Sequence, residues 1–343
     1  MDTTRLKRTG FASLASMVAA RAGFLASVQP LQAIEDVPID ASLGRVLARD
    51  IKARFPVPWF DKSAMDGYAI NASDSFGASV QDPRELRVAG RVAIEDEPSC
   101  KVIPGSAVKV ATGSVIPAGA DAVIKIEDTD LDPSGERVLV YKQIVPGGNI
   151  IQSGEDYGEN QIVLATGRKV RPEDIGVLAT LGHSRVTVTR HPRVAIFATG
   201  NELVDLGDLH ADETGVADPR RAGPCKLVDS NRHAIGAFVT MAGGIVARAM
   251  MLPDDENVIK DEISAAIASC DMVVTTGGTS VGERDFIPTI ISSHHEVLYH
   301  GIAMKPGAAT LLGTSGGKPI IGASGFPVAA EIAMLYFGMP AIR

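Results

Sequence analysis

Aromatic residues and cysteines are scarce in this 343-residue chain, and long apolar runs are missing. Aromatics make up 5% of the residues, with one tryptophan, which argues against a base-stacking platform for nucleic acid. The cysteines Cys100, Cys225 and Cys270 are odd in number, widely spaced and without a CxxC pair, so they predict neither a disulfide framework nor a zinc site. Because no run of about 18 apolar residues occurs, we expect no membrane span.

Basic residues are also in the minority. The chain has 33 Lys and Arg against 41 Asp and Glu, a net charge of −8, which disfavours binding to nucleic acid or to an anionic membrane. Basic residues do precede an apolar stretch at residues 11–20, as in a signal peptide, but Arg21 interrupts it and no small-residue cleavage site follows. We therefore predict an N-terminal amphipathic helix and a cytoplasmic protein.

Glycine is what the sequence has in excess. The 35 glycines are about a tenth of the chain, above the usual ~7%. From residue 193 onward, glycine turns separate predicted strands at 194–198 and 271–275 from helices such as 256–269. This alternation predicts a parallel or mixed sheet covered by helices on both faces, with ligands bound beyond the carboxyl ends of the strands. Residues 56–148 instead show short β-branched segments broken by Pro and Gly, which predicts a small β-rich domain.

The strongest local signal is the segment TTGGTSVGERD at residues 275–285. A strand that runs into Gly277 and Gly278 can direct successive backbone N–H groups toward an anion, because glycine permits the backbone conformations required. The hydroxyls of Thr279 and Ser280 add donors. The segment is neither a dinucleotide fingerprint nor a P-loop. A tight structural turn is the alternative interpretation.

Several acids follow strands or turns. Asp229 and Asp285 each precede a predicted helix at the same end of the sheet, and each can cap that helix or bind a ligand through its carboxylate. Asp66, in FDKSAMDGYA, is followed by a glycine, so a hairpin turn is the alternative to a functional role there. Carboxylates beside a phosphate-binding turn indicate Mg²⁺ chemistry on a phosphate-bearing substrate.

Seven ordered segments resemble the MoeA/gephyrin-E family of molybdenum cofactor biosynthesis. They are FDKSAMDGYA, ATGSVIPAGADAV, GGNIIQSGEDY, RVAIFATGNEL, VDSN, TTGGTSVGERDF and AMKPG, and they span residues 50–310 almost continuously. The resemblance implies an α/β fold class, with a MogA/MoaB-like molybdopterin-binding domain whose mixed sheet has helices on both faces. It assigns that domain to residues 191–343, a β-rich domain to 51–148 and an elongated linker domain to 1–50 with 149–190. A further C-terminal β domain, usual in the family, is absent from these 343 residues.

The resemblance also implies an activity. Such proteins take adenylylated molybdopterin, release AMP in a Mg²⁺-dependent step and insert molybdate. They usually act as homodimers, with a site between the α/β domain of one subunit and the β-rich domain of the other. The implied partners are the pterin substrate and, further, other cofactor-biosynthesis proteins or a molybdoenzyme, with no nucleic acid and no membrane.

Candidate site residues follow from matching the motifs one by one. The candidate catalytic residues are Asp66, Asp156, Glu202, Asp229, Asp285 and Lys305. The candidate cofactor-binding residues are Thr112, Gly277, Gly278, Thr279, Ser280 and Gly282. Asp229 and Asp285 are also the candidate Mg²⁺ ligands.

The C-terminal part departs from the family pattern. Ala308 follows the KPG segment where the family has lysine, and Gly301 replaces another lysine. The signature LPGNPVS reads ASGFPVA here, with Phe326 and Ala329 in place of the amide and the hydroxyl. An oxyanion needs cationic and hydroxyl donors, which Arg220, Arg221 and Lys226 in a long loop could provide. The alternative is therefore a molybdopterin-binding paralogue, a chaperone or store, that has lost molybdate insertion, and the choice between molybdate and tungstate stays open.

Overall fold

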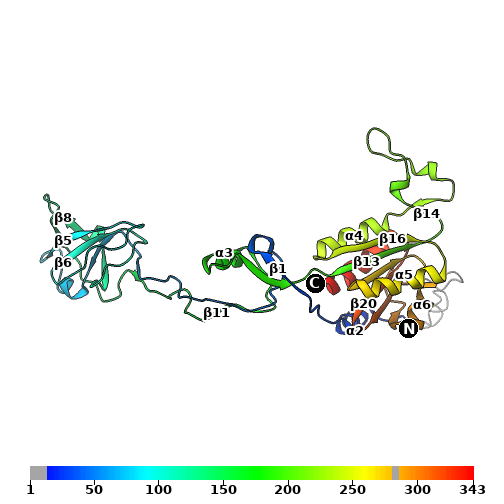
Figure 1. Ribbon diagram of the computed structural model, residues 1–343, viewed down its shortest axis with the longest axis horizontal. Coiled ribbons are helices and arrows are strands. Elements are labelled where there is room, and N and C mark those ends of the chain that lie inside the picture. Colours follow the sequence, from blue (N-terminus) through cyan, green and yellow to red (C-terminus); the bar gives the residue numbers. More distant parts are fainter. Residues whose placement is uncertain (1–13, 280–285) are drawn as a thin grey trace. The chain divides into compact units, whose positions relative to one another are not determined.

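The computed structural model describes residues 14–279 and 286–343, which belong to two compact units (Figure 1). Of these residues, 14–34, 189–279 and 286–343 form the α/β unit, and 35–188 form the β unit. Among the described residues, no helix is long and apolar enough to cross a membrane.

One six-stranded sheet organises the α/β unit. Its order is β16 (Ile245–Leu252), β13 (Arg193–Thr199), β17 (Met272–Thr276), β20 (Lys318–Ala323), β19 (Leu311–Ser315) and β18 (Glu296–His300). The first four strands are parallel, and the last two pair antiparallel. Alternate residues of β13 enter two separate cores, Val194 and Ile196 on one face and Ala195 and Phe197 on the other. The predicted α/β class and mixed sheet are confirmed.

Helices cover both faces of this sheet (Figure 1). The helices on one face are α2 (Met17–Ser27), α4 (Asn231–Ala242), α7 (Pro327–Ala333) and α8 (Met339–Ile342), with the π-helical turn Met334–Gly338 between the last two. The helices on the other face are α5 (Glu256–Ser269) and α6 (Phe286–His294). Helix α5 begins where the Asp255 carboxylate accepts hydrogen bonds from the N–H groups of Asn257 and Val258, at 2.9 and 3.1 Å.

Helix α2 is the predicted N-terminal helix, but its partners differ from the predicted grouping. We assigned residues 1–50 to a linker domain together with 149–190. The structure instead places residues 14–34 with the α/β unit. Phe24 is fully buried there, with its ring 6.4 Å from that of Phe337 in an edge-to-face contact. The neighbouring Gly23 lies against Tyr299 of β18, because a Cβ at this position would be 2.1 Å from the Tyr299 hydroxyl oxygen.

A second six-stranded sheet organises part of the β unit. Its order is β7 (Ala122–Lys125), β4 (Gly67–Ile70), β6 (Ser106–Val110), β5 (Arg84–Val92), β9 (Arg137–Val140) and β8 (Thr129–Leu131). Strand β4 alternates between two cores: Tyr68 and Ile70 pack in one, and Ala69 packs in the other. This sheet is the β-rich region that the short β-branched segments predicted.

The rest of the β unit has its own small core around Leu47, Leu178 and Val188. Its elements are helix α3 (Pro172–Thr180) and the strand pairs β1 (Ile34–Pro38) with β12 (Arg185–Thr189), β2 (Ile51–Lys52) with β11 (Ile162–Leu164), and β3 (Lys62–Ser63) with β10 (Ile150–Ile151). Arg168 fixes the start of α3 by donating to both carboxylate oxygens of Asp174, at 2.8 and 2.9 Å.

Candidate functional site

A cavity of about 820 Å³ lies at the carboxyl ends of β13, β17 and β20. This is the edge at which ligands bind in sheets of parallel strands. Its lining comes from Asp254 and from residues within 199–203, 227–231, 276–279, 307–309 and 324–327. Segments far apart in the sequence therefore meet here, among them the glycine-containing turns at Gly200, at Gly277 and Gly278, at Gly307 and at Gly325.

The double-glycine turn after β17 forms one wall. Gly277 and Gly278 both have positive φ, at 89° and 60°. A Cβ on Gly277 would lie 2.4 Å from the Thr199 carbonyl oxygen, so only glycine lets this turn pack against the end of β13. The Gly277 N–H donates to the Ala323 carbonyl at 3.1 Å. Within the described residues, the N–H groups of Gly278 and Thr279 have no hydrogen-bond partner, which leaves two adjacent donors at the cavity.

Thr279 is the last described residue of this turn. It is buried, and its hydroxyl donates to the Ala323 carbonyl at 3.4 Å. Its own carbonyl accepts a hydrogen bond from His300 Nε2 at 3.0 Å, which fixes the turn to the end of β18. The predicted site residues Ser280, Gly282 and Asp285 lie outside the described residues.

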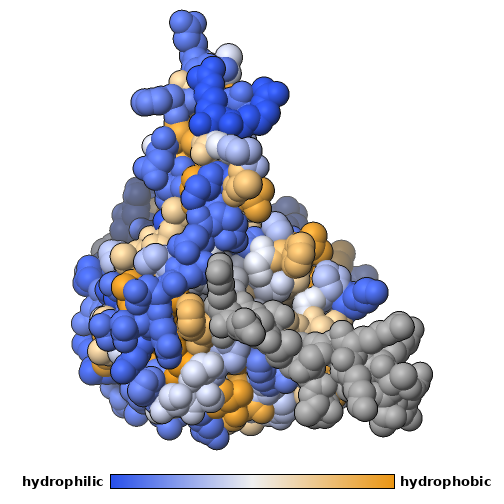
Figure 2. Space-filling view, turned by 90° about the vertical axis from the view of Figure 1, so that its right-hand side faces the viewer, coloured by the Kyte–Doolittle hydropathy of each residue, from blue (hydrophilic) through white to orange (hydrophobic). Residues whose placement is uncertain are grey.

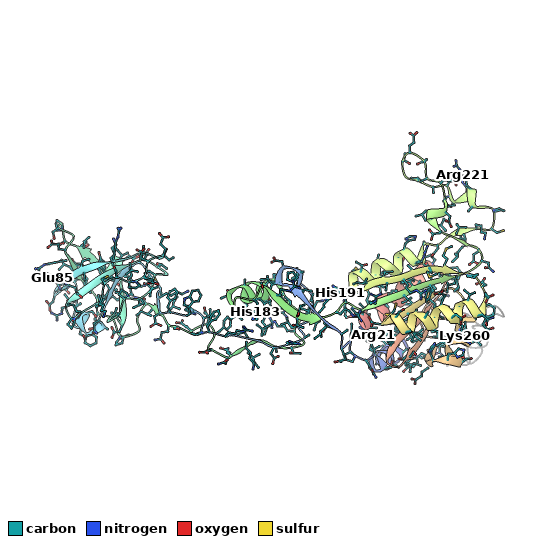
Figure 3. All side chains as sticks on the ribbon, viewed as in Figure 1. Arg21, Glu85, His183, His191, Arg221 and Lys260 are labelled. Atoms are coloured by element: carbon teal, nitrogen blue, oxygen red, sulfur yellow. The ribbon has the colours of Figure 1, made fainter. Side chains whose placement is uncertain are left out.

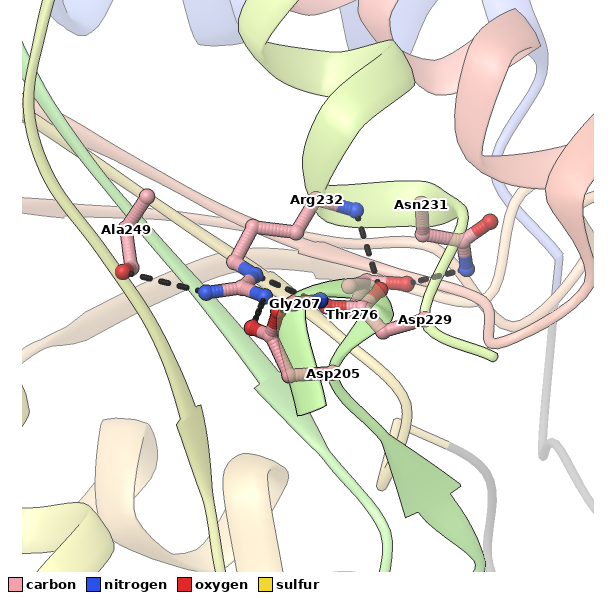
Figure 4. Close-up of polar contacts among 7 residues, drawn as sticks. All are labelled: Asp205, Gly207, Asp229, Asn231, Arg232, Ala249 and Thr276. Carbon is pink, nitrogen blue, oxygen red and sulfur yellow. Dashed lines mark hydrogen bonds and ion pairs between the residues drawn. The ribbon is translucent and has the colours of Figure 1, made fainter. Parts of the chain in front are cut away.

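Asp229 lies at the start of α4, and its carboxylate contacts Arg232 twice (Figure 4). Oδ1 accepts from the Arg232 backbone N–H at 3.1 Å, and Oδ2 accepts from Arg232 Nε at 2.8 Å. The Asp229 side chain is only 1% exposed. The structure therefore shows the helix-start interaction, and Asp229 also belongs to the cavity lining.

Asn231 connects three segments of the lining. Its Nδ2 donates to Thr276 Oγ1 at 2.7 Å and to the Gly325 carbonyl at 2.8 Å. Thr276 Oγ1 in turn donates to the Ser324 carbonyl at 3.1 Å. Within the described chain, the buried Asn231 Oδ1 has no partner. This network joins α4, β17 and the turn before α7, and sequence reasoning missed it although the VDSN motif contains the residue.

Two further acids line the cavity. The Glu202 side chain is exposed and folds toward Gly200, where a Cβ would lie 2.5 Å from Glu202 Oε1. Asp254, which the sequence analysis did not select, accepts from the Asn201 N–H at 3.1 Å through Oδ2. No lysine or arginine belongs to the described lining. Nearby, Lys226 Nζ donates to the Asn201 carbonyl at 2.6 Å, so one of the three predicted loop cations reaches the neighbourhood of the cavity.

The described residues do not by themselves make a magnesium site. No group of three or more His, Cys, Asp or Glu side chains within residues 14–279 and 286–343 is placed to hold a metal ion. Asp229, one predicted ligand, is buried and hydrogen-bonded to Arg232 through both of its oxygens. The other predicted ligand, Asp285, is outside the described part of the chain.

The wall at residues 307–309 and 324–327 is mostly small or apolar. Gly307 and Ala308 line the cavity, whereas Lys305 is exposed and does not belong to the lining. Phe326, at the start of α7, lines the cavity with 79% of its surface exposed. The sequence departures at Ala308 and Phe326 therefore fall on the cavity itself.

In the β unit, the structure brings Asp66 and Thr112 together. Asp66 Oδ1 accepts from the Thr112 N–H at 2.8 Å and from its hydroxyl at 3.2 Å, and Asp66 is exposed. Within the described chain, no hydrogen bond or ion pair engages Asp66 Oδ2. The hairpin alternative at Gly67 is wrong, because β3 pairs with β10 while β4, which Gly67 begins, pairs with β6 and β7.

Asp156 is not joined to this pair by any described contact. It is exposed, and its backbone N–H donates to the Val57 carbonyl at 3.0 Å. A different acid, Asp61, links the loops around Asp66, since its Oδ1 accepts from the Ser153 N–H at 2.7 Å. Asp61 lies in FDKSAMDGYA, so the motif pointed to the right loop even though the linking residue went unselected.

Comparisons with known proteins cover both units. Residues 15–182 match the MoeA N-terminal region (domains I and II), and residues 195–343 match the probable molybdopterin binding domain. A molybdopterin molybdenumtransferase of Staphylococcus aureus is 35% identical over 309 residues, which are 90% of this chain and 70% of that protein. The Staphylococcus epidermidis protein of the same name is 33% identical over the same length. The crystal structure of the molybdopterin biosynthesis MoeA protein from Pyrococcus horikoshii OT3 aligns with a TM-score of 0.80 at 33% identity, over 96% of this chain and 79% of that one.

Proposed function

The chain belongs to the MoeA family, and we propose that it acts in molybdenum cofactor biosynthesis as a molybdopterin molybdenumtransferase. In this proposal it takes adenylylated molybdopterin and molybdate and releases AMP. The observation that carries the proposal is the cavity at the carboxyl ends of β13, β17 and β20, with the double-glycine turn as its wall. Its volume of about 820 Å³ is within the range of small-molecule sites.

In this proposal, the double-glycine turn binds the phosphate of the substrate. The N–H groups of Gly278 and Thr279 are adjacent, and neither is used elsewhere in the described structure. Successive backbone N–H groups in such a turn form a concave anion site without a positive side chain. This matters because the described lining contains acids but no lysine or arginine. The pterin phosphate binds here, and the apolar wall at Ala308 and Phe326 faces a less polar part of the substrate.

Asp66 supplies the proton-accepting part. Thr112 holds Oδ1 with two hydrogen bonds, which fixes the carboxylate while Oδ2 stays available. In the proposed step, a water molecule held by Oδ2 attacks phosphorus in the phosphoanhydride. The anhydride P–O bond breaks, AMP leaves, and the water proton passes to the carboxylate. Support comes from the exposed free oxygen and from the family resemblance of the surrounding motif.

A Mg²⁺ requirement is a separate element of the proposal. The ion would neutralise phosphate oxygens of the bound substrate. Since the described acids do not assemble a ligand set, its ligands would come from those phosphate oxygens and from residues such as Asp285. Treatment with EDTA should abolish AMP release and added Mg²⁺ should restore it, whereas full activity in EDTA would remove the ion from the account.

We also propose that the active form is a homodimer, as the family resemblance implies, in which the α/β domain of one subunit works with the β-rich domain of the other. A measured mass twice that of one chain is expected in solution. A sharper test mixes two inactive variants, one altered at Asp66 and one at Asp285, under conditions that exchange subunits. Recovery of part of the activity supports the dimer, and a monomeric, fully active protein contradicts it.

The whole proposal is tested by turnover of adenylylated molybdopterin with molybdate and Mg²⁺, recording AMP release and molybdenum incorporation separately. Both are expected. AMP release without molybdenum incorporation would replace the transferase with the cofactor-binding alternative. If the protein neither releases AMP nor binds molybdopterin, the proposed function fails.

A further inference from the structure

One wall of the cavity is built at the base of a long excursion. Strands β14 (Leu203–Val204) and β15 (Leu227–Val228) pair in parallel, and residues 205–226 between them form what we call the excursion. It projects from the α/β unit in Figure 1, its visible surface is largely hydrophilic in Figure 2, and it carries Arg221 in Figure 3. Leu203, Leu227 and Val228, at its two ends, line the cavity.

Arg232 links the two ends of this excursion. Its guanidinium forms an ion pair with Asp205, the first residue of the excursion, and with Asp229, which directly follows β15 (Figure 4). A third contact, from Nη1 to the Ala249 carbonyl at 3.3 Å, anchors the same side chain to β16. Arg232 itself does not belong to the cavity lining. Its effect on a bound molecule must therefore act through the segments that it holds.

The Arg232 guanidinium pairs with two carboxylates in a mostly buried position, so its removal should destabilise this region. The side chains of Arg232 and Asp229 are 12% and 1% exposed. The hydrogen bond from Arg232, with a second from the Gly207 N–H, holds the pKa of Asp205 below its usual value. The guanidinium is the shared counter-ion of the Asp205 and Asp229 carboxylates. Without it, two negative groups would face one another in a largely buried place, which favours separation of the two ends.

We propose that Arg232 is a positioning residue for the proposed reaction: by tying Asp205 to Asp229 it keeps β14 and β15 paired and so holds the cavity wall formed by Leu203, Leu227 and Val228. A wall that is ordered in advance reduces the entropy lost on binding. Loss of the tie therefore weakens substrate binding more than it slows the chemical step. This inference rests on the proposed function for its substrate, but the tie itself can be measured without turnover.

The first test is limited trypsin digestion, because trypsin cleaves after Arg220, Arg221 and Lys226, which all belong to the excursion. Arg232→Gln should be cut there about 10-fold faster than the wild type, as expected when a buried ion pair loses one partner. Asp205→Asn, which leaves the Arg232–Asp229 pair intact, should show a smaller increase and provides a variant that folds more readily. Arg248→Gln is the matched control, since it breaks an ion pair with Glu262 in the same unit and should leave cleavage at these sites unchanged.

The second test is steady-state AMP release by the same variants. Arg232→Gln should raise KM for adenylylated molybdopterin about 10-fold with kcat within about threefold of wild type, and Arg232→Lys should recover part of the KM, because the charge is kept and the forked geometry is lost. Unchanged trypsin cleavage in Arg232→Gln would show that Arg232 does not hold the two ends of the excursion together. Faster cleavage with unchanged KM would overturn its role in substrate binding. A wild type without turnover would overturn the proposed function, while the digestion would still decide the tie.

Discussion

Asp229 in the α/β unit and Asp66 in the β unit are held in opposite ways. In the α/β unit, Asp229 is buried, and both of its oxygens accept hydrogen bonds from Arg232. In the β unit, Asp66 is exposed, and one oxygen is held by Thr112 while the other has no partner in the described structure. A carboxylate enclosed with its counter-ion shapes a structure, whereas a held carboxylate with a free oxygen can exchange a proton. We infer that the α/β unit mainly supplies binding and that the β unit supplies the reactive acid.

The largest expected effect comes from Asp66→Asn. The amide oxygen can still accept from Thr112, so the fold should be preserved, but the side chain can no longer take a proton. The kcat for AMP release should fall at least about 100-fold, as for loss of a general base. Asp61→Asn is the matched control in the same loop and should change kcat little. A rate near that of the wild type in Asp66→Asn would assign the chemistry to another group.

Next comes Asp229→Ala, which tests the other half of the comparison through stability. The substitution removes the acceptor at the start of α4 and leaves Arg232 partly buried with one carboxylate instead of two. Breaking such a pair should lower the free energy of unfolding by about 3 kcal/mol. Urea denaturation measures the change. An unchanged midpoint would show that Asp229 is not a structural element of this unit.

A smaller effect is expected from Gly278→Ala. Gly278 has φ of 60°, and a Cβ would lie 3.1 Å from Thr199 Oγ1, so the substitution should cost about 1 kcal/mol of stability and raise KM by disturbing the two free N–H groups. Gly182→Ala is the matched control, because Gly182 has φ of 77° and open space around it. It should cost similar stability with no change in KM. Equal KM values for both variants would argue against phosphate binding at the turn.

The smallest effect concerns pH. Burial lowers the pKa of His183 in the β unit and of His295 in the α/β unit, with further lowering by Arg54 and His294, respectively. Both histidines are therefore more readily protonated in the unfolded chain, where the pKa of a histidine is about 6.5. Protonation of these two histidines therefore favours the unfolded chain. Their effect on the free energy of unfolding is absent above about pH 6.5, and the free energy falls as the pH drops below 6.5 toward the pKa values of the folded protein. Urea midpoints at pH 7.5 and 5.5 should differ less in the variants His183→Asn and His295→Asn than in the wild type.

Local sequence patterns predicted the elements of the α/β unit well. The predicted strands 194–198 and 271–275 correspond to β13 and β17, and helix 256–269 corresponds to α5. These predictions were correct because apolar periodicity and glycine turns are encoded within a few residues. The double-glycine turn was predicted for the same reason, since positive φ at Gly277 and Gly278 is a local requirement.

Contacts between distant segments were not predictable in this way. The packing of α2 on the α/β unit depends on Phe24 meeting Phe337, more than 300 residues later. Arg232 was missed because its partner Asp205 is brought to it only when the excursion returns as β15. The role of Asp229 could not be read from the sequence for the same reason. Its carboxylate accepts hydrogen bonds from Arg232, and the Arg232 side chain reaches this position only in the folded unit.

The most direct test of the division between the units is a side-by-side measurement of kcat and KM for AMP release by Asp66→Asn and Arg232→Gln. The account predicts a loss of kcat with KM nearly unchanged in the first variant, and a raised KM with kcat nearly unchanged in the second. If both variants lose kcat to the same extent with unchanged KM, binding and chemistry are not divided between the two units as we infer.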